Sequence, residues 1–279
     1  MSGARDRHVI SAMGLTEVVI ENGRVVSVTA PKIDYCPLFK KYRNLDQLTA
    51  DEVKKNMELR IREFGFCSPN RQTRMGDFIT FGVSEILATA LHSGVIDAAV
   101  IVSDGCGTAV VSDPEIVQGL CGRISGILET SPIAKVIKDV GADRVLNPKN
   151  ACIDQLRGAD KAAQMGFRKF AVTVSNGSDA AVIRSKYSDR AVVIGVHTTG
   201  VSRAGAEQMF DNCDIISACA SGPLHELASE RKDTLIAGNK VPIYGVTPFG
   251  KKLVLYKLHS IGREPWYGQP AADPARPLF

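Results

Sequence analysis

The sequence lacks any apolar run close to the ~18 residues that a membrane-spanning helix requires. Residues 1–8 carry charge but no apolar segment of the kind found in a secretory signal. We therefore expect a cytoplasmic protein that does not bind membranes and whose thiols are mostly reduced. The formal net charge is +4, from 34 basic and 30 acidic residues, which is too small to predict a nucleic-acid-binding protein.

Several common catalytic and cofactor motifs are also missing. Neither G-x-x-x-x-G-K-[ST] nor a G-x-G-x-x-G after a first strand occurs, so no standard nucleotide-binding loop is predicted. The absence of H-E-x-x-H and G-x-S-x-G excludes the common zinc proteases and α/β-hydrolases. Because no C-x-x-C occurs, any metal cluster would need cysteines from separate loops or from a second chain.

The first part of the chain predicts antiparallel β structure followed by a helix. Hydrophobic residues make up 44% of the 279 residues, which is enough for an ordinary core. Two β-branched runs, Thr16–Glu21 and Arg24–Thr29, flank Asn22-Gly23, a strong signal for a β-hairpin. A helix is expected from a capping Thr49 to about Phe64.

The rest of the chain alternates apolar runs with helical segments, which predicts a parallel sheet. Strands are expected at Asp97–Ser103, Lys169–Val174, Ala191–Val196, Asp214–Ser217 and Val241–Val246. Helices are expected at Ser178–Tyr187, Ser202–Phe210, Gly222–Glu230 and Phe249–Ile261. The predicted fold class is α/β, a mostly parallel sheet with flanking helices, preceded by an N-terminal antiparallel β-hairpin subdomain. We assign residues 1–45 to that subdomain, which includes a Cys-Pro loop, 46–262 to the α/β domain, and 263–279 to an extended or disordered tail.

Ligands of such sheets bind at the loops that follow the carboxyl ends of the strands. The most informative of these loops are Asp104–Thr108, His197–Gly200 and Ala218–Gly222. His197 is a candidate general acid or base, and Thr198 and Thr199 are candidate donors to an anion. A structural role for His197 is an equal alternative. The remaining histidines are expected to be peripheral: His8, His92, His225 and His259.

Seven cysteines are spread evenly along the chain, which does not indicate a disulfide framework. Cys67 lies near Arg71 and Arg74, which would favour its thiolate or bind an anionic substrate. Cys106 lies between two glycines and is expected to be exposed. The alternatives are a loop cysteine beside solvated arginines for the first, and a tight turn with an incidental thiol for the second.

Four cysteines fall in predicted loops and form the preferred metal-ligand set: Cys36, Cys67, Cys106 and Cys219. Cys36 precedes a proline, and cysteine-proline pairs occur beside iron–sulfur clusters. The glycine-rich segment Gln118–Pro132 is interpreted as a helix that approaches a ligand, with Arg123 as a further anion-binding residue. A helix packed tightly through its glycines is the alternative.

Eight segments match one known family in the same order along the chain. They are Tyr35–Tyr42, Arg60–Cys67, Phe81–Ile86, Asp113–Gly119, Gly122–Gly126, Glu129–Ile133, His197–Gly200 and Ala218–Ser221. Through them the chain resembles the methanogenesis marker protein 8 family, also called DUF2099. The resemblance implies a role connected to methyl-coenzyme M reductase or its coenzymes, and it brings no catalytic residues to carry over. The composition also suits a bacterial relative that uses coenzyme M without methanogenesis.

The leading hypothesis is a cysteine-dependent protein of coenzyme M metabolism that handles sulfur on a small anionic substrate such as a sulfonate. Cys67 and Cys106 would act as nucleophiles or hold an iron–sulfur cluster, and His197 would move protons. An alternative is a non-catalytic metallocofactor carrier or assembly factor for the reductase, with a stable protein partner. A third is a ligand-binding α/β protein whose cysteines belong to the core. The expected partners are a small anionic or thiol metabolite, and a protein partner or a second copy of the chain.

Overall fold

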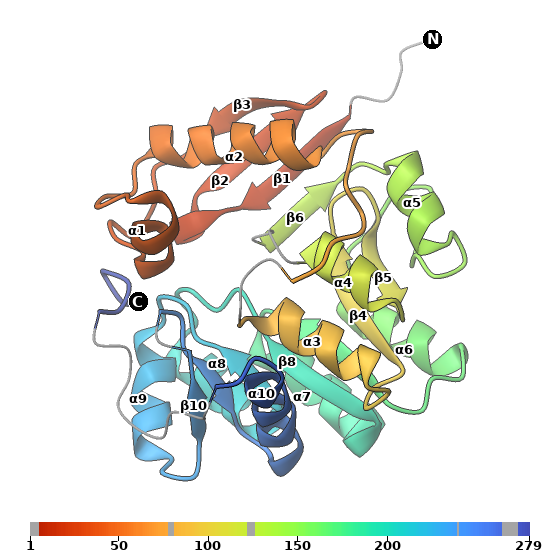
Figure 1. Cartoon of the computed structure of the whole chain (residues 1–279), viewed down its shortest axis with the longest axis vertical. Coiled ribbons are helices and arrows are strands. Elements are labelled where there is room, and N and C mark those ends of the chain that lie inside the picture. The colour runs from red at the N-terminus through yellow and green to blue at the C-terminus, as the bar shows by residue number, and fades with distance from the viewer. Residues whose placement is uncertain (1–5, 78–80, 122–125, 239, 264–272) are drawn as a thin grey trace.

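The chain is built around two β-sheets (Figure 1), and the computed structural model describes residues 6–77, 81–121, 126–238, 240–263 and 273–279. The strand order of the larger sheet is β10 (Leu235–Ala237), β11 (Ile243–Gly245), β9 (Ile215–Ser217), β8 (Ala191–Gly195), β7 (Phe170–Val174), β4 (Ala98–Ser103) and β5 (Gly107–Val111). The central strands β9, β8, β7 and β4 pair in parallel, whereas β10, β11 and β5 are joined by antiparallel pairing. The predicted α/β class with a mostly parallel sheet is confirmed.

Helices cover both faces of this sheet. One face carries α3 (Val83–His92), α4 (Pro114–Cys121), α5 (Ala134–Val140) and α10 (Pro248–Ser260). The other carries α6 (Gln155–Gln164), α7 (Gly177–Tyr187), α8 (Arg203–Asn212) and α9 (Gly222–Glu230). Because β7 and β8 are buried against helices on both sides, their sequences are continuous apolar runs rather than alternating ones.

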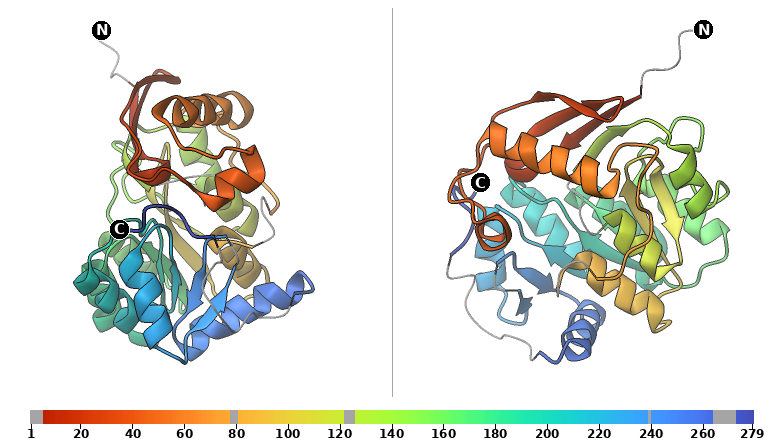
Figure 2. Two further views of the ribbon diagram at one scale, coloured as in Figure 1. Left: turned by 90° about the vertical axis from the view of Figure 1, so that its left-hand side faces the viewer. Right: turned by 45° about the horizontal axis from the view of Figure 1, so that its top comes forward.

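The smaller sheet is antiparallel, with the order β3 (Arg24–Val28), β2 (Glu17–Glu21), β1 (Arg7–Ser11) and β6 (Gly126–Thr130). The predicted hairpin is confirmed, since Asn22 and Gly23 connect β2 and β3 with φ values of 49° and 71°. Helix α2 (Ala50–Phe64) packs on this sheet (Figure 2). Its predicted cap is also confirmed, because the Thr49 hydroxyl accepts the Glu52 N–H at 3.2 Å.

Two local predictions were wrong. The segment Gln118–Pro132 is not one helix, because α4 ends at Cys121 and Gly126–Thr130 forms β6 against β1. Long-range strand pairing therefore overrides the local pattern. The Cys-Pro loop is also shorter than expected, because Pro37 begins helix α1 (Pro37–Arg43), at a position where its missing N–H costs no hydrogen bond. Arg123 lies outside the described residues.

The two sheets meet at the carboxyl ends of the parallel strands. After β4, the Gly105 N–H donates to the Thr130 hydroxyl of β6 at 2.8 Å. After β8, a Cβ placed on Gly126 would lie 2.7 Å from the His197 ring, so these residues are in contact. We call this region the junction, and it holds the loops in which the sequence predicts chemistry. No helix among the described residues has the length and apolar character needed to cross a membrane.

Candidate functional site

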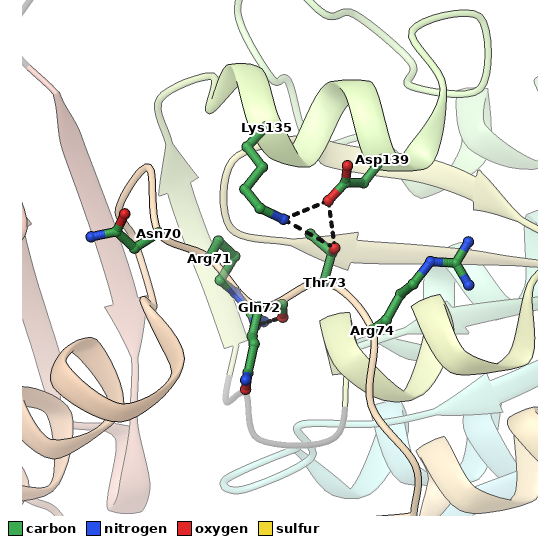
Figure 3. A pocket seen from close by; sticks show the side chains of 7 residues that line it. All are labelled: Asn70, Arg71, Gln72, Thr73, Arg74, Lys135 and Asp139. Atoms are coloured by element: carbon green, nitrogen blue, oxygen red, sulfur yellow. Dashed lines mark hydrogen bonds and ion pairs between the residues drawn. The ribbon is translucent and has the colours of Figure 1, made fainter.

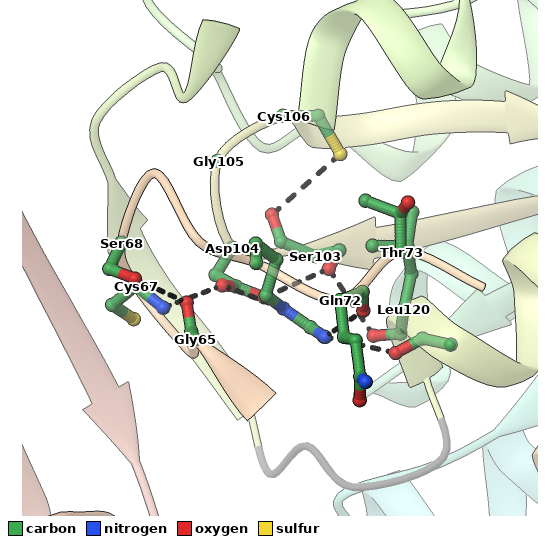
Figure 4. Close-up of polar contacts among 12 residues, drawn as sticks. Gly65, Cys67, Ser68, Gln72, Thr73, Ser103, Asp104, Gly105, Cys106 and Leu120 are labelled. Atoms are coloured by element: carbon green, nitrogen blue, oxygen red, sulfur yellow. Dashed lines mark hydrogen bonds and ion pairs between the residues drawn. The ribbon is translucent and has the colours of Figure 1, made fainter. Parts of the chain in front are cut away.

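At the junction, the loop after β4 is organised by a fully buried carboxylate, Asp104 (Figure 4). Asp104 accepts hydrogen bonds from the Arg71 Nε at 3.0 Å and from the Cys67 backbone N–H at 2.8 Å. The Ser103 hydroxyl donates a third, at 3.1 Å. These bonds compensate the buried charge and join the loop after α2 to the large sheet.

Arg71, predicted to bind substrate, makes all its described contacts within the protein. Its terminal nitrogens donate to the backbone carbonyls of Gln72 at 2.5 Å and Gly119 at 3.1 Å. Arg74 is exposed and bridges Asp113 at 2.7 Å and Glu115 at 3.3 Å. An anionic substrate would therefore compete with internal carboxylates and carbonyls for both guanidinium groups.

A cavity of about 420 Å³ lies beside these arginines (Figure 3). It is lined by Asn70, Arg71, Gln72, Thr73, Arg74, Lys135 and Asp139. The Lys135 ammonium group and the Thr73 hydroxyl both bond the Asp139 carboxylate, at 2.6 Å each. The Lys135 ammonium and the Thr73 hydroxyl hold the pKa of that carboxyl below its usual value. The lysine charge is therefore already neutralised within the cavity.

The two predicted nucleophiles, Cys67 and Cys106, are fully buried. Burial raises the pKa of both thiols, and the nearby Asp104 carboxylate raises them further. The expectation that Cys106 is exposed was wrong, because Ile133 packs directly over Gly105 and the thiol belongs to the large-sheet core. In the described conformation, both sulfur atoms are therefore neutral and shielded from substrates.

The other two predicted ligands, Cys36 and Cys219, form a pair of half-buried thiols at the junction. Burial raises the pKa of Cys219, and a negative charge on Cys36 would raise it further. Cys36 also packs in one small apolar cluster with Ala220, the residue that follows Cys219. We call Cys36 and Cys219 the thiol pair.

Each thiol of the pair faces groups that stabilise its anion, although burial remains the larger influence on both pKa values. The backbone N–H of Thr198 and the hydroxyl of Thr199 oppose the rise in the pKa of Cys219. The backbone N–H groups of Phe39 and Leu38, in the first turn of α1, do the same for Cys36. Both thiols are therefore protonated at neutral pH in the described conformation, and these donors would stabilise either thiolate once a base removes the proton.

The loop that carries Cys219 is held by an extended hydrogen-bond network. The Cys219 N–H donates to the Thr198 hydroxyl at 3.2 Å, and that hydroxyl donates to the Ser217 carbonyl at 2.7 Å. The Cys219 carbonyl lies 3.2 Å from the His225 Nε2, and the His225 Nδ1 lies 3.2 Å from the Tyr244 hydroxyl. These contacts fix the direction of the Cys219 backbone.

His225 and Tyr244 were missed by sequence reasoning. His225 was expected to be peripheral, but its Nε2 contacts the Cys219 carbonyl. His8 was also expected to be peripheral, but it is fully buried and bonds the Thr130 hydroxyl. The only sequence signal for His225 is its spacing of six residues from Cys219, which places it in the first turn of the helix that follows the Cys219 loop. Tyr244 comes from β11 and has no local signal of its role.

His197 follows β8 in a left-handed conformation, with φ of 55°. Burial lowers the pKa of its imidazole, so the ring is neutral at neutral pH and can accept a proton. It lies in the loop next to that of Cys219, because β8 and β9 are neighbours in the sheet. The Thr198 hydroxyl also bonds the Ser217 carbonyl, and the hydroxyls of Thr198 and Thr199 both oppose the rise in the pKa of Cys219.

The described residues contain no group of three or more histidine, cysteine, aspartate or glutamate side chains placed to hold a metal ion. The four predicted ligands are divided between the thiol pair and the two separate cores that contain Cys67 and Cys106. A cluster bound by all four cysteines therefore does not fit this arrangement.

The fold and the site define an α/β protein with a thiol pair at the carboxyl edge of its parallel sheet. The model of the family described as "Uncharacterized protein conserved in archaea (DUF2099)" matches residues 8–259, and the chain belongs to this family. The chain is also similar to "Uncharacterized protein MJ0054" of Methanocaldococcus jannaschii, with 44% identity over 263 residues that cover 92% of each chain. Both matches are archaeal and do not support a bacterial relative.

Proposed function

We propose that this protein handles sulfur on a small anionic substrate and that the thiol pair is its reactive site. The observation that supports this most is that Cys36 packs against the cluster that contains Ala220, the neighbour of Cys219, at the edge where α/β sheets bind ligands. The donors around each thiol and the fixed Cys219 backbone add to this support. Cys67 and Cys106 have structural roles in the proposal.

A pair of thiols suits sulfur transfer because one can carry the sulfur and the other can release the product. The Cys219 thiolate attacks the outer sulfur of a persulfide donor R–S–SH, which forms Cys219–S–SH and releases R–S⁻. The bound persulfide loses its proton to His197, and its outer sulfur displaces the leaving group X⁻ from an electrophilic carbon of the substrate R′–X, which gives Cys219–S–S–R′. Cys36 then attacks the Cys219 sulfur, which releases the product R′–SH and leaves a Cys36–Cys219 disulfide. An external dithiol reduces that disulfide and becomes a disulfide itself.

The resemblance to the methanogenesis marker protein 8 family supplies the substrate class. On that basis we propose a role in coenzyme M metabolism, with a small sulfonate as the anionic substrate. The proposed reaction does not use an iron–sulfur cluster, because the thiol pair supplies only two of the four cysteine ligands that such a cluster usually has. The carrier hypothesis would need the other half from a partner protein or a second copy of the chain.

Persulfide trapping tests the proposal. The purified protein is treated with a low-molecular-weight persulfide, and each cysteine peptide is examined by mass spectrometry for one added sulfur atom. We expect the addition at Cys219, its loss in Cys219→Ser, and its retention in Cys36→Ser, which carries sulfur but cannot release product. Cys152→Ser is the matched control, because Cys152 is a half-buried thiol outside the pair. Addition to Cys152 or to no cysteine would contradict the proposal.

Anaerobic purification with iron and sulfide analysis separates the proposal from the carrier hypothesis. We expect substoichiometric iron and sulfide in the wild-type protein, unchanged by Cys36→Ser. Stoichiometric iron and sulfide that disappear in Cys36→Ser and Cys219→Ser would instead favour a cluster shared with another chain.

A further inference from the structure

The segment 273–279 crosses the junction and touches the immediate neighbours of both thiols. In Figures 1 and 2 the C-terminal end lies between α1 and α9, the helices that begin just after Cys36 and Cys219. We call residues 273–279 the strap. The proposed function gives this segment no role.

One end of the strap is joined to the residues before Cys36. The Arg276 carbonyl accepts the N–H groups of Asp34 at 2.7 Å and Tyr35 at 3.1 Å, and the Arg276 N–H donates to the Tyr35 carbonyl at 3.1 Å. The Arg276 guanidinium lies over the Tyr35 ring, 4.1 Å from its centroid, and the Tyr35 hydroxyl bonds the Asp273 carboxylate. Arg276 and Asp273 also form an ion pair at 2.9 Å.

The other end is joined to the residues after Cys219. The Phe279 N–H donates to the Ala220 carbonyl at 3.3 Å, and the Gly222 N–H donates to the Phe279 carbonyl at 2.6 Å. Between the two ends, Ala275 packs in the same small apolar cluster as Cys36 and Ala220. The strap therefore holds the two cysteine loops together and covers the space beside them.

The strap is held by exposed side chains and a few backbone hydrogen bonds, so it can detach from the rest of the protein. The side chains of Arg276 and Asp273 are exposed, and Leu278 and Phe279 are 38% and 43% exposed. Exposed ion pairs and a few backbone hydrogen bonds contribute little net stability, whereas the buried core of the protein contributes much more. Local opening of such a segment is therefore far more frequent than global unfolding.

We propose that the strap is a lid that controls the access of substrate to the thiol pair. The proposal rests on the proposed function for the identity of the reactive site. It states that Cys36 and Cys219 react only when the strap leaves Tyr35 and Ala220. Regulation follows, because any partner or ligand that binds the open strap would increase the reactivity of both thiols together.

Thiol labelling in the full-length protein tests the lid. The rate of alkylation by iodoacetamide is measured at each cysteine by peptide mass spectrometry, with Cys152 as the internal reference. Arg276→Ala removes the guanidinium over the Tyr35 ring and should increase the rates at Cys36 and Cys219 roughly two- to fivefold, about the effect of losing an exposed cation–π contact on a local opening equilibrium. Tyr35→Phe keeps the ring but loses the bond to Asp273, so it should also increase both rates.

Arg231→Ala is a matched control, because Arg231 also pairs with a carboxylate, Asp211, and lies over an aromatic ring, Phe210. This variant should leave both rates unchanged. Equal rates at the thiol pair in wild type, Arg276→Ala and the double variant with Tyr35→Phe would overturn the proposal. A rate increase that extends to the fully buried Cys213 would also overturn it, since the whole fold would then be loosened.

Alkylation needs no sulfur donor, so it tests the lid independently of persulfide trapping, which tests the proposed function. Faster labelling of the pair in Arg276→Ala without persulfide uptake in any variant would overturn the function alone. Persulfide uptake at Cys219 with labelling rates independent of Arg276 would overturn the lid alone.

Discussion

Replacing Arg71 with alanine should lower the free energy of unfolding by about 3–5 kcal/mol, the usual cost of removing one partner of a buried ion pair. The side chains of Arg71 and Asp104 are 2% and 0% exposed, so the charge left on Asp104 could not reach water. The substitution also removes the donors to the Gln72 and Gly119 carbonyls. Asp104 keeps two donors, the Cys67 N–H and the Ser103 hydroxyl, which keeps the loss within this range.

Urea unfolding followed by circular dichroism measures this loss, with the slope of the transition checked for constancy. Arg74→Ala is the control, because the exposed Arg74 and its carboxylate partners should contribute less than about 1 kcal/mol. Similar small losses in both variants would refute the structural role of Arg71. Weaker binding of a sulfonate by Arg71→Ala, with unchanged stability, would identify Arg71 as a substrate-binding residue instead.

Three further predictions concern the surroundings of the thiol pair. The free energy of unfolding should fall as the pH drops below about 6.5, because burial lowers the pKa of His197 and His225 in the folded protein. Below that pH the unfolded chain binds protons that the folded protein does not. Unfolding curves that do not change with pH would contradict this. Gly126→Ala should displace the His197 ring and raise its pKa toward the ordinary value in an NMR titration, whereas Gly76→Ala, where nothing lies within 4 Å of the added methyl group, should not. Tyr244→Phe should lower the free energy of unfolding by about 1 kcal/mol and increase the alkylation rate of Cys219, because the His225 Nδ1 loses its hydrogen-bond partner. An unchanged alkylation rate would show that this hydrogen-bond network does not control the Cys219 thiol.

The parts of the fold that were predictable depend on local chemistry. The turn at Asn22-Gly23 needs two positive φ values, and the helix after Thr49 needs a capping oxygen, so both can be seen in a few residues. The apolar runs of β7 and β8 are also local signals of strands buried on both faces.

The parts that were missed depend on distant contacts. β6 forms in a glycine-rich segment because β1 pairs with it, and Cys106 is buried because Ile133 covers the turn. Of the four predicted metal ligands, Cys36 and Cys219 lie on loops that pack together, in an arrangement that depends on how the small sheet docks on the large one. No pattern within a short stretch of sequence carries that information.

Disulfide mapping after mild oxidation of the folded, full-length protein tests the thiol pair most directly. The account predicts a Cys36–Cys219 disulfide as the main product, because Cys36 packs against the cluster that contains Ala220, whereas Cys67 and Cys106 lie within separate cores. The product should be absent from Cys36→Ser and Cys219→Ser and unaffected by Cys152→Ser. Both thiols remaining unoxidised, or each joining a different cysteine, would contradict the account.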